Sequence, residues 1–240
     1  MPDRWIVATS MGFRPGKRTP LEPGPVFDLL FSLAQRPSQP KLCYVGTAWG
    51  DDRHISARVV EAFQGSGVEV STLALFPMPN VEDLTAHLCA QDVVWVGGGS
   101  VAGLLAMWRL HGLDAAMRSA WEAGVVLAGV SAGSICWHLG GPTDSFGPTL
   151  RPITNGLGLL PYGNGVHYDG EAQRRPLLHR LVADQTLPLS YATDDGVGLV
   201  YKGTALLEAV TERPGAHAYR VERQADGSVT ETVIEARVLS

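Results

Sequence analysis

A serine flanked by small residues follows an apolar run near the middle of this chain. Residues 129–133 read Gly-Val-Ser-Ala-Gly and come directly after a β-branched segment. Where a strand turns sharply into a helix, such a serine is lifted above the sheet edge, and glycine on either side avoids collisions in the tight turn. The pattern predicts that Ser131 is a nucleophile for acyl transfer, with an ordinary strand–helix corner as the alternative.

The backbone around this serine could also stabilise negative charge. The N–H of Ala132 would lie at a helix N-terminus, where an oxyanion is favoured. A second glycine cluster, residues 97–99, lies between another predicted strand and helix, so the Gly99 amide could face Ser131 from a neighbouring strand. Together with Ala102 this cluster also fits a weak dinucleotide pattern, which would suit a non-catalytic nucleotide- or metabolite-binding module.

A serine nucleophile needs a general base, and His167 is the preferred candidate among the seven histidines. It lies 36 residues after Ser131, in a short strand-like segment framed by glycines, within a region rich in loops. Such loops often carry functional residues. A different chain order, Ser131 followed by Asp194 or Asp195 and then His217, would suit an α/β-hydrolase esterase.

Alternating strand and helix patterns must position these groups. Strands are expected over 5–9, 41–45, 68–73, 93–96 and 125–130, and helices over 25–34, 55–64, 81–90, 101–108 and 113–122. This alternation predicts an α/β fold with a three-layer, doubly wound, mostly parallel sheet. Functional groups of such sheets gather at the carboxyl ends of the strands.

The C-terminal third of the chain shows a different pattern of expected elements. A helix is expected over 171–184 and short strands over 196–201, 205–210, 218–222 and 229–234, the last two as an antiparallel hairpin. No internal repeat or low-complexity linker interrupts the chain. Residues 1–240 are therefore expected to form a single domain.

The composition argues against several classes of protein. With 19 basic and 24 acidic residues, the net charge of −5 does not suit a nucleic-acid surface. No apolar run reaches membrane-spanning length, and no secretory signal is recognised. The three cysteines form no metal-type pair. We expect a cytoplasmic protein without metal or cofactor, acting on a small molecule, and the sequence leaves a homo-oligomer open.

The combined motifs point to one family. The glycine cluster at 97–100, the Gly-Val-Ser-Ala-Gly segment and a histidine about 35 residues later resemble the peptidase E (aspartyl dipeptidase) and cyanophycinase family of serine peptidases. The resemblance extends from the first strand to about Gly196. It implies a fold like that of class I glutamine amidotransferases, flavodoxin-like in its sheet, and hydrolysis of small peptides that begin with aspartate.

The resemblance also assigns roles within a Ser-His-acid triad. Ser131 would be the nucleophile and His167 the general base, and the amides of Gly99 and Ala132 would form the oxyanion hole. The triad logic requires an acid that holds the imidazole in the correct tautomer.

Three carboxylates remain open as that acid. Asp144 lies nearest to the spacing found in peptidase E, Glu171 lies four residues after His167, and Asp169 ranks third.

Recognition of an aspartyl side chain calls for a cation with a bidentate fork. Arg174 and Arg175 begin the helix after His167, where family members place a substrate-binding arginine. The alternative for both is a solvated helix face.

Overall fold

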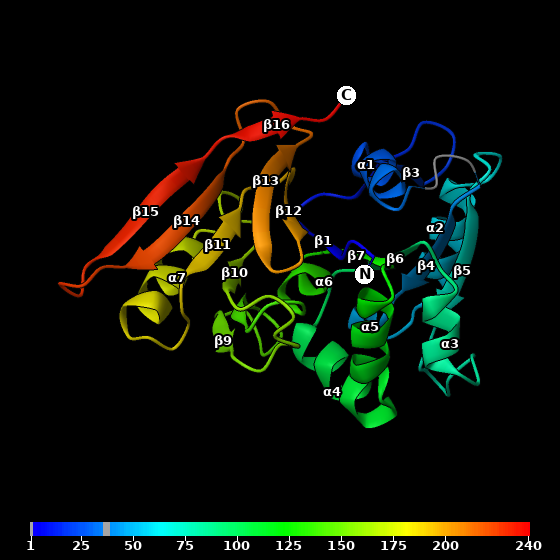
Figure 1. Ribbon diagram of the computed structural model, residues 1–240, viewed down its shortest axis with the longest axis horizontal. Helices are drawn as coiled ribbons and strands as arrows, with labels where there is room; N and C mark the ends of the chain where they lie inside the picture. Colours follow the sequence, from blue (N-terminus) through cyan, green and yellow to red (C-terminus); the bar gives the residue numbers. More distant parts are fainter. Residues whose placement is uncertain (1, 36–38) are drawn as a thin grey trace.

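The computed structural model describes residues 2–35 and 39–240. At its centre lies an eight-stranded sheet in the order β16-β13-β12-β1-β7-β6-β4-β5 (Figure 1). Its parallel part consists of β1 (Trp5–Thr9), β4 (Lys41–Val45), β5 (Glu69–Leu73), β6 (Val93–Val96) and β7 (Val126–Val130). The predicted α/β class with a mostly parallel sheet is confirmed, and the bounds of β1, β4 and β6 agree with the sequence expectation.

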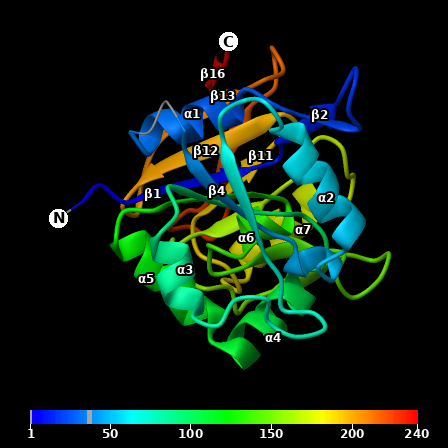
Figure 2. The same cartoon turned by 90° about the vertical axis from the view of Figure 1, so that its right-hand side faces the viewer.

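Helices cover both faces of this sheet because its inner strands are apolar on both sides. The helices are α1 (Val26–Leu33), α2 (Arg53–Ala62), α3 (Leu84–Cys89), α4 (Val101–His111) and α5 (Leu113–Glu122). Side chains of α1 and α2 share one buried cluster, whereas α3, α4 and α5 contribute to another. Figure 2 shows α1 above the sheet and α3, α4 and α5 below it.

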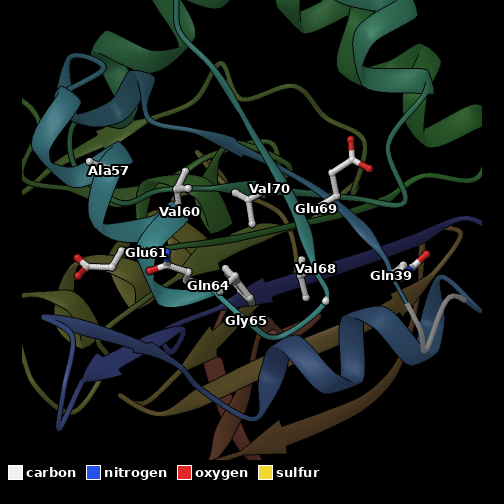
Figure 3. Close-up of a pocket in the computed structure, with 11 residues that line it drawn as sticks. Gln39, Ala57, Val60, Glu61, Gln64, Gly65, Val68, Glu69 and Val70 are labelled. Atoms are coloured by element: carbon white, nitrogen blue, oxygen red, sulfur yellow. The ribbon is translucent and has the colours of Figure 1, made fainter.

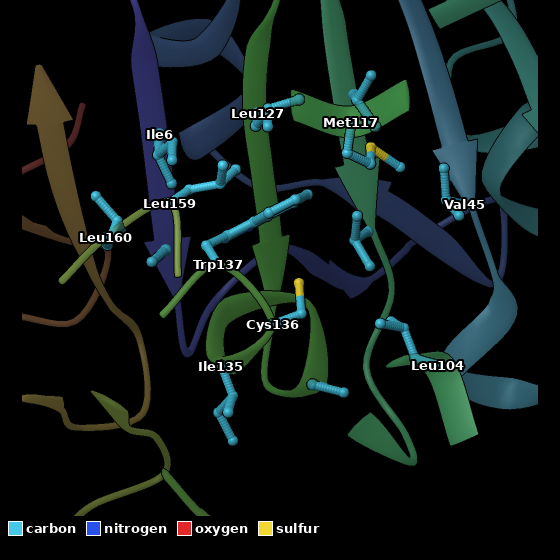
Figure 4. Close-up of a cluster of buried hydrophobic side chains, with 14 of the residues drawn as sticks. Ile6, Val45, Leu104, Met117, Leu127, Ile135, Cys136, Trp137, Leu159 and Leu160 are labelled. Atoms are coloured by element: carbon cyan, nitrogen blue, oxygen red, sulfur yellow. The ribbon is translucent and has the colours of Figure 1, made fainter. Parts of the chain in front are cut away.

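Alternate residues of β1 illustrate the layering. Val7 belongs to the cluster under α1 and α2, while Ile6 and Ala8 belong to the opposite cluster. On that second face, Trp137 lies with Ile6 and Leu127, close to the segment that carries Cys136 (Figure 4). The segment that follows Ser131 is therefore anchored in the core by the fully buried side chains of Cys136 and Trp137.

The C-terminal strands divide between two sheets. β12 (Val197–Lys202) runs antiparallel to β1, and β13 (Ala205–Thr211) and β16 (Ala236–Val238) extend the central sheet beyond it. The predicted hairpin is confirmed as β14 (Ala218–Arg223) and β15 (Val229–Ile234).

This hairpin belongs to a four-stranded sheet in the order β10-β11-β14-β15. Its other strands are β10 (Gly163–Gly165) and β11 (Ser190–Thr193), and α7 (Arg174–Ala183) packs against it.

Several short elements were not predicted individually from the sequence, because they are too brief to show periodicity. They are β2 (Phe13–Pro15), β3 (Leu21–Pro23), the 3-10 helix η1 (Thr47–Trp49), β8 (Gly141–Thr143), β9 (Arg151–Ile153) and β11.

A groove of about 770 Å³ lies between the C-terminal end of α2 and the edge strand β5 (Figure 3). Gln39, Val68 and Glu69 line it, so it opens at the amino ends of β4 and β5. The serine turn lies at the opposite, carboxyl end of the sheet. This groove is therefore remote from the candidate site.

Among the described helices, none is long and apolar enough to cross a membrane.

Candidate active site

Ser131 occupies a strained turn between β7 and the short helix α6 (Ala132–Ile135). Its backbone angles are φ 57° and ψ −110°, which a non-glycine residue rarely adopts. A Cβ placed on Gly129 would lie 2.5 Å from the Gly133 carbonyl oxygen, and one on Gly133 would lie 2.3 Å from the Val96 oxygen. The two glycines therefore have the steric role that the sequence suggested, and the turn has the geometry of a nucleophile elbow.

The glycine cluster after β6 lies beside this elbow. A Cβ added to Gly98 would be only 3.4 Å from Cβ of Ser131. Gly99 has φ +125°, and a Cβ there would lie 2.3 Å from the Ala48 carbonyl oxygen. Only glycine fits this conformation, which brings the loop against both η1 and the serine.

Thr9, the last residue of β1, and the following residue, Ser10, hold the elbow and the histidine together. The Ser131 N–H donates to the Thr9 carbonyl at 3.0 Å, and the His167 N–H donates to Oγ of Ser10 at 3.0 Å. The Gly196 N–H donates to the Ser10 carbonyl at 2.9 Å. Three segments that are distant in sequence thus attach to two adjacent residues. Sequence reasoning assigned no role to Ser10, since a lone serine at a strand end carries no pattern.

His167 forms an ion-pair-like hydrogen bond with Asp195. Nδ1 of His167 lies 2.6 Å from Oδ1 of Asp195. The parallel register of β10 and β11 explains this, because Gly165 lies opposite Ala192 and both chains continue a few residues beyond. With Nδ1–H donated to the carboxylate, Nε2 is the nitrogen available to accept a proton.

The Ser131 hydroxyl makes no hydrogen bond to His167 within the described residues. In unliganded hydrolases this contact is often long and tightens only when substrate binds.

The carboxylate on His167 differs from the three expected from sequence. Asp144 is exposed and has no hydrogen bond to His167 in the part of the chain described here. Glu171 instead accepts two hydrogen bonds from the Arg174 guanidinium, at 2.8 and 3.1 Å. Strand β11, which carries Asp195 at its end, was not predicted, and that is why this pairing was missed.

Asp169 supports Asp195 rather than the imidazole. Its Oδ1 accepts the Asp195 N–H at 2.8 Å, and its Oδ2 bonds to Arg213. Partial burial would raise the pKa of Asp169, but the hydrogen bonds from Arg213 and the Asp195 amide outweigh it and lower the pKa. The Asp169 carboxylate is therefore held in its charged form while it accepts the backbone N–H of Asp195.

The two arginines proposed as substrate ligands both have partners within the protein. Arg174 is buried, donates to the Pro142 carbonyl and forks onto Glu171. Arg175 pairs with Glu231 and lies over the rings of Tyr168 and Tyr219, 4.4 and 4.6 Å from their centroids. Both arginines thus have carboxylate partners within the protein, and the expected contact of either one with substrate stays a prediction.

The structure does not assemble the esterase arrangement. Asp194 accepts from the backbone N–H of His217 at 3.1 Å and from the Tyr219 hydroxyl at 3.1 Å. Nδ1 of His217 instead faces Glu235 at 3.6 Å. With Asp195 engaged by His167, the pairs needed for the Ser-Asp-His order do not meet.

The nucleotide pattern is also disfavoured, because the backbone amides at the start of α4 already have acceptors within the protein. The Ala102 N–H donates to Oγ of Ser145 at 3.3 Å, and the Gly103 N–H donates to Oγ of Ser100 at 3.1 Å. The Ser100 N–H donates to the Ala48 carbonyl at 2.8 Å. A phosphate at this helix N-terminus would have to displace these contacts.

Across residues 2–35 and 39–240, no group of three or more His, Cys, Asp or Glu side chains is arranged to hold a metal ion.

An α/β sheet with a serine elbow and a neighbouring His–Asp pair defines a serine hydrolase. Residues 22–208 match the model of peptidase family S51, and the chain belongs to this family of serine peptidases. It is 43% identical over 183 residues to the uncharacterized peptidase YgaJ of Bacillus subtilis (strain 168), which covers 76% of this chain and 78% of that protein. The resemblance to the peptidase E family drawn from the motifs is therefore confirmed.

Solved structures support the fold. A Listeria monocytogenes EGD-e protein assigned to peptidase E matches with a TM-score of 0.59 at 16% identity, over 87% of this chain and 98% of that chain. A peptidase from an acI-B1 Actinobacterium matches with a TM-score of 0.66 at 15% identity, over 98% and 95% of the two chains.

Proposed function

We propose that this peptidase is a dipeptidase that hydrolyses short peptides with an N-terminal aspartate through an acyl-enzyme on Ser131. The observation that carries the proposal is the attachment of the Ser131 elbow and the His167–Asp195 pair to two adjacent residues, Thr9 at the end of β1 and Ser10. Hydrolysis of an amide by serine needs a nucleophile, a base and an acid that orients the base, and this arrangement offers all three.

In the proposed reaction, Oγ of Ser131 attacks the scissile carbonyl while Nε2 of His167 takes the hydroxyl proton. Asp195 holds the imidazole through Nδ1 and stabilises the imidazolium that forms. The imidazolium then protonates the leaving amine, and the C–N bond breaks. A water molecule activated by the same imidazole hydrolyses the acyl-enzyme, which releases the first amino acid and restores the serine.

The developing oxyanion would be bound by backbone donors. We assign this role to the amides of Ala132, the first residue of α6, and Gly99 in the neighbouring loop. The Ala132 amide has no carbonyl within its own helix to bind, because it lies in the first turn. Each such donor contributes about 3 kcal/mol to stabilisation of the transition state.

The aspartate preference rests on the family, since Arg174 and Arg175 are already paired with carboxylates. The free thiols of Cys43, Cys89 and Cys136 agree with action in the reducing cytoplasm, which we propose as its location.

A fluorophosphonate probe and a dipeptide panel test the proposal together. The wild-type protein is expected to be labelled at Ser131 and to cleave aspartyl dipeptides faster than alanyl or lysyl ones. Ser131→Ala should lose both labelling and hydrolysis while keeping its melting temperature. Hydrolysis that survives Ser131→Ala, or an enzyme that loses activity with His217→Ala but not with His167→Ala, would contradict the proposed site.

A further inference from the structure

A charged groove adjoins the candidate site on the side of β1. It has a volume of about 670 Å³, and its lining residues include Ser10, Val130 and Asp195. These residues connect it to the elbow and the triad, since Val130 precedes Ser131 and Asp195 binds His167. A substrate bound at Ser131 therefore has space to extend into this groove.

Two half-exposed arginines also line the groove. Arg14 comes from β2 and donates through Nε to Glu212 at 3.0 Å, and Arg213 bonds to Asp169. Their side chains are 47% and 49% exposed, unlike that of Arg174 at 3%. A guanidinium has five N–H donors, so Arg14 keeps its two terminal nitrogens for another acceptor.

Position in the groove distinguishes these arginines from those of α7, since the Arg175 side chain is also 40% exposed but lies against Tyr168 and Tyr219, outside this groove. Arg174 is sealed between Glu171 and the Pro142 carbonyl, whereas Arg14 and Arg213 border open space beside Asp195. Arginine binds carboxylates with a planar fork of two parallel N–H donors. Glu212 in the same lining could receive a peptide amine.

We propose that Arg14 and Arg213 bind a carboxylate of the peptide substrate in this groove. The inference rests on the proposed function and names the residues that select its substrate. The carboxylate has two possible sources: the side chain of a first aspartate, or the free carboxyl terminus of the second residue.

Steady-state kinetics with four peptides separate these sources. The peptides are aspartyl-leucine, asparaginyl-leucine and the C-terminal amide of each, so that each carboxylate is removed singly and together. The variants are Arg14→Gln and Arg213→Gln. The matched control is Arg237→Gln, whose arginine also forms an exposed pair, with Glu208, but outside the groove.

Arg14→Gln and Arg213→Gln are expected to lower kcat/KM about tenfold or more for peptides with the recognised carboxylate, mainly through KM. The peptide without either carboxylate should be affected less than about threefold. If kcat/KM falls only for the two aspartyl peptides, the recognised carboxylate is the aspartate side chain. If it falls only for the two peptides with a free C-terminus, the recognised carboxylate is the terminal one. Arg237→Gln should leave all four unchanged.

Equal losses on all four peptides, or no loss with either variant, would overturn the inference even if Ser131→Ala abolishes activity. Asp169, the partner of Arg213, also accepts the backbone N–H of Asp195, so Arg213→Gln also affects the support of Asp195. If Arg213→Gln lowers kcat on every peptide, the result with Arg14→Gln is the decisive one. Calorimetric titration of aspartyl-leucine into Ser131→Ala, with and without Arg14→Gln, tests binding independently of hydrolysis. Weaker binding with Arg14→Gln supports the groove even if the proposed reaction fails, and unchanged binding refutes it.

Discussion

Oγ of Ser10 accepts the backbone N–H of His167 at 3.0 Å and lies 2.7 Å from Oγ1 of Thr193. His167 has φ 51°, a conformation that needs support from its surroundings in a non-glycine residue. Thr193 precedes the aspartate pair at the end of β11. A single buried hydroxyl therefore connects the backbone of the imidazole to the strand that carries its carboxylate.

Ser10→Ala should lower kcat by about three- to tenfold, because the hydrogen bond that it removes positions the backbone of His167. Ser10→Thr keeps a hydroxyl and should recover part of the rate. Stopped assays with an aspartyl dipeptide, together with melting temperatures, provide the measurement. A fall in stability with unchanged kcat would show that Ser10 serves only the fold.

Asp195→Asn should reduce kcat by roughly 10³- to 10⁴-fold, because an amide no longer stabilises the imidazolium or enforces the tautomer with Nε2 free. Asp144→Asn is the matched control and should change kcat less than about twofold, since Asp144 is exposed and away from the imidazole. Both rates are measured on one peptide at saturating concentration. The reverse ranking of the two variants would reinstate Asp144 as the acid.

Gly133→Ala should destabilise the protein by about 3 kcal/mol or more, because its Cβ would lie 2.3 Å from the Val96 carbonyl oxygen, which the sheet holds in place. Gly103→Ala in α4 is a control, since its Cβ would meet only the Ser100 side chain, 3.3 Å from Oγ and 3.5 Å from Cβ, and no backbone atom outside its own helix. That variant should gain up to about 1 kcal/mol from helix propensity. Chemical denaturation of the two variants gives the comparison, and equal stabilities would refute the steric argument.

The sequence was sufficient for the elements with strong patterns. The apolar runs of β1, β4 and β6 predicted their bounds, and Ser131 could be placed because the glycines of an elbow leave a signature. The carboxylate partner of His167 could not be found in this way. Asp195 meets His167 through β11, a four-residue strand, Ser-Tyr-Ala-Thr, that has neither length nor strong apolar periodicity.

The arginines show a second limit of sequence reasoning. Arg174 and Arg175 are adjacent on α7, yet Arg174 is buried and Arg175 lies against two tyrosine rings. Tyr219 and Glu231 come from the β14–β15 hairpin, and no local pattern indicates that this hairpin packs on α7. Which cation remains available to substrate depends on such long-range contacts.

Arg174→Gln should lower the free energy of unfolding by about 2 kcal/mol or more, because it removes the donors to Glu171 and to the buried Pro142 carbonyl. The ratio of kcat/KM for acidic and neutral dipeptides should stay within about twofold. Urea denaturation and the peptide panel measure the two effects. A large change in that ratio without loss of stability would return Arg174 to the substrate site.

His138 predicts a pH-dependent contribution to stability. Its imidazole is fully buried, with Nδ1–H donated to the Ser134 carbonyl at 2.9 Å and Nε2 facing the Tyr201 hydroxyl at 3.3 Å. Burial lowers the pKa of His138 from 6.5 to about 4. Between these values the unfolded chain binds a proton that the folded protein does not, so stability falls as pH falls.

Above pH 6.5 His138 is neutral in both the folded and the unfolded protein, and the full free energy of unfolding is present. About 3 kcal/mol of it is lost as the pH falls to 4. His138→Asn keeps a donor toward the Ser134 carbonyl but removes the titration. The difference in unfolding free energy between wild type and this variant should therefore shrink on acidification from pH 7 to pH 4. A constant difference over that interval would mean that His138 does not titrate as described.

The convergence of three segments on Thr9 and Ser10 has a consequence for biosynthesis. The partner of Ser10 at His167 lies 157 positions later, and β12, which completes the pairing of β1, ends only at Lys202. A ribosome has thus made most of the polypeptide before Ser131 and His167 can both be held at the end of β1. We therefore expect a translation product that stops before β12 to lack peptidase activity.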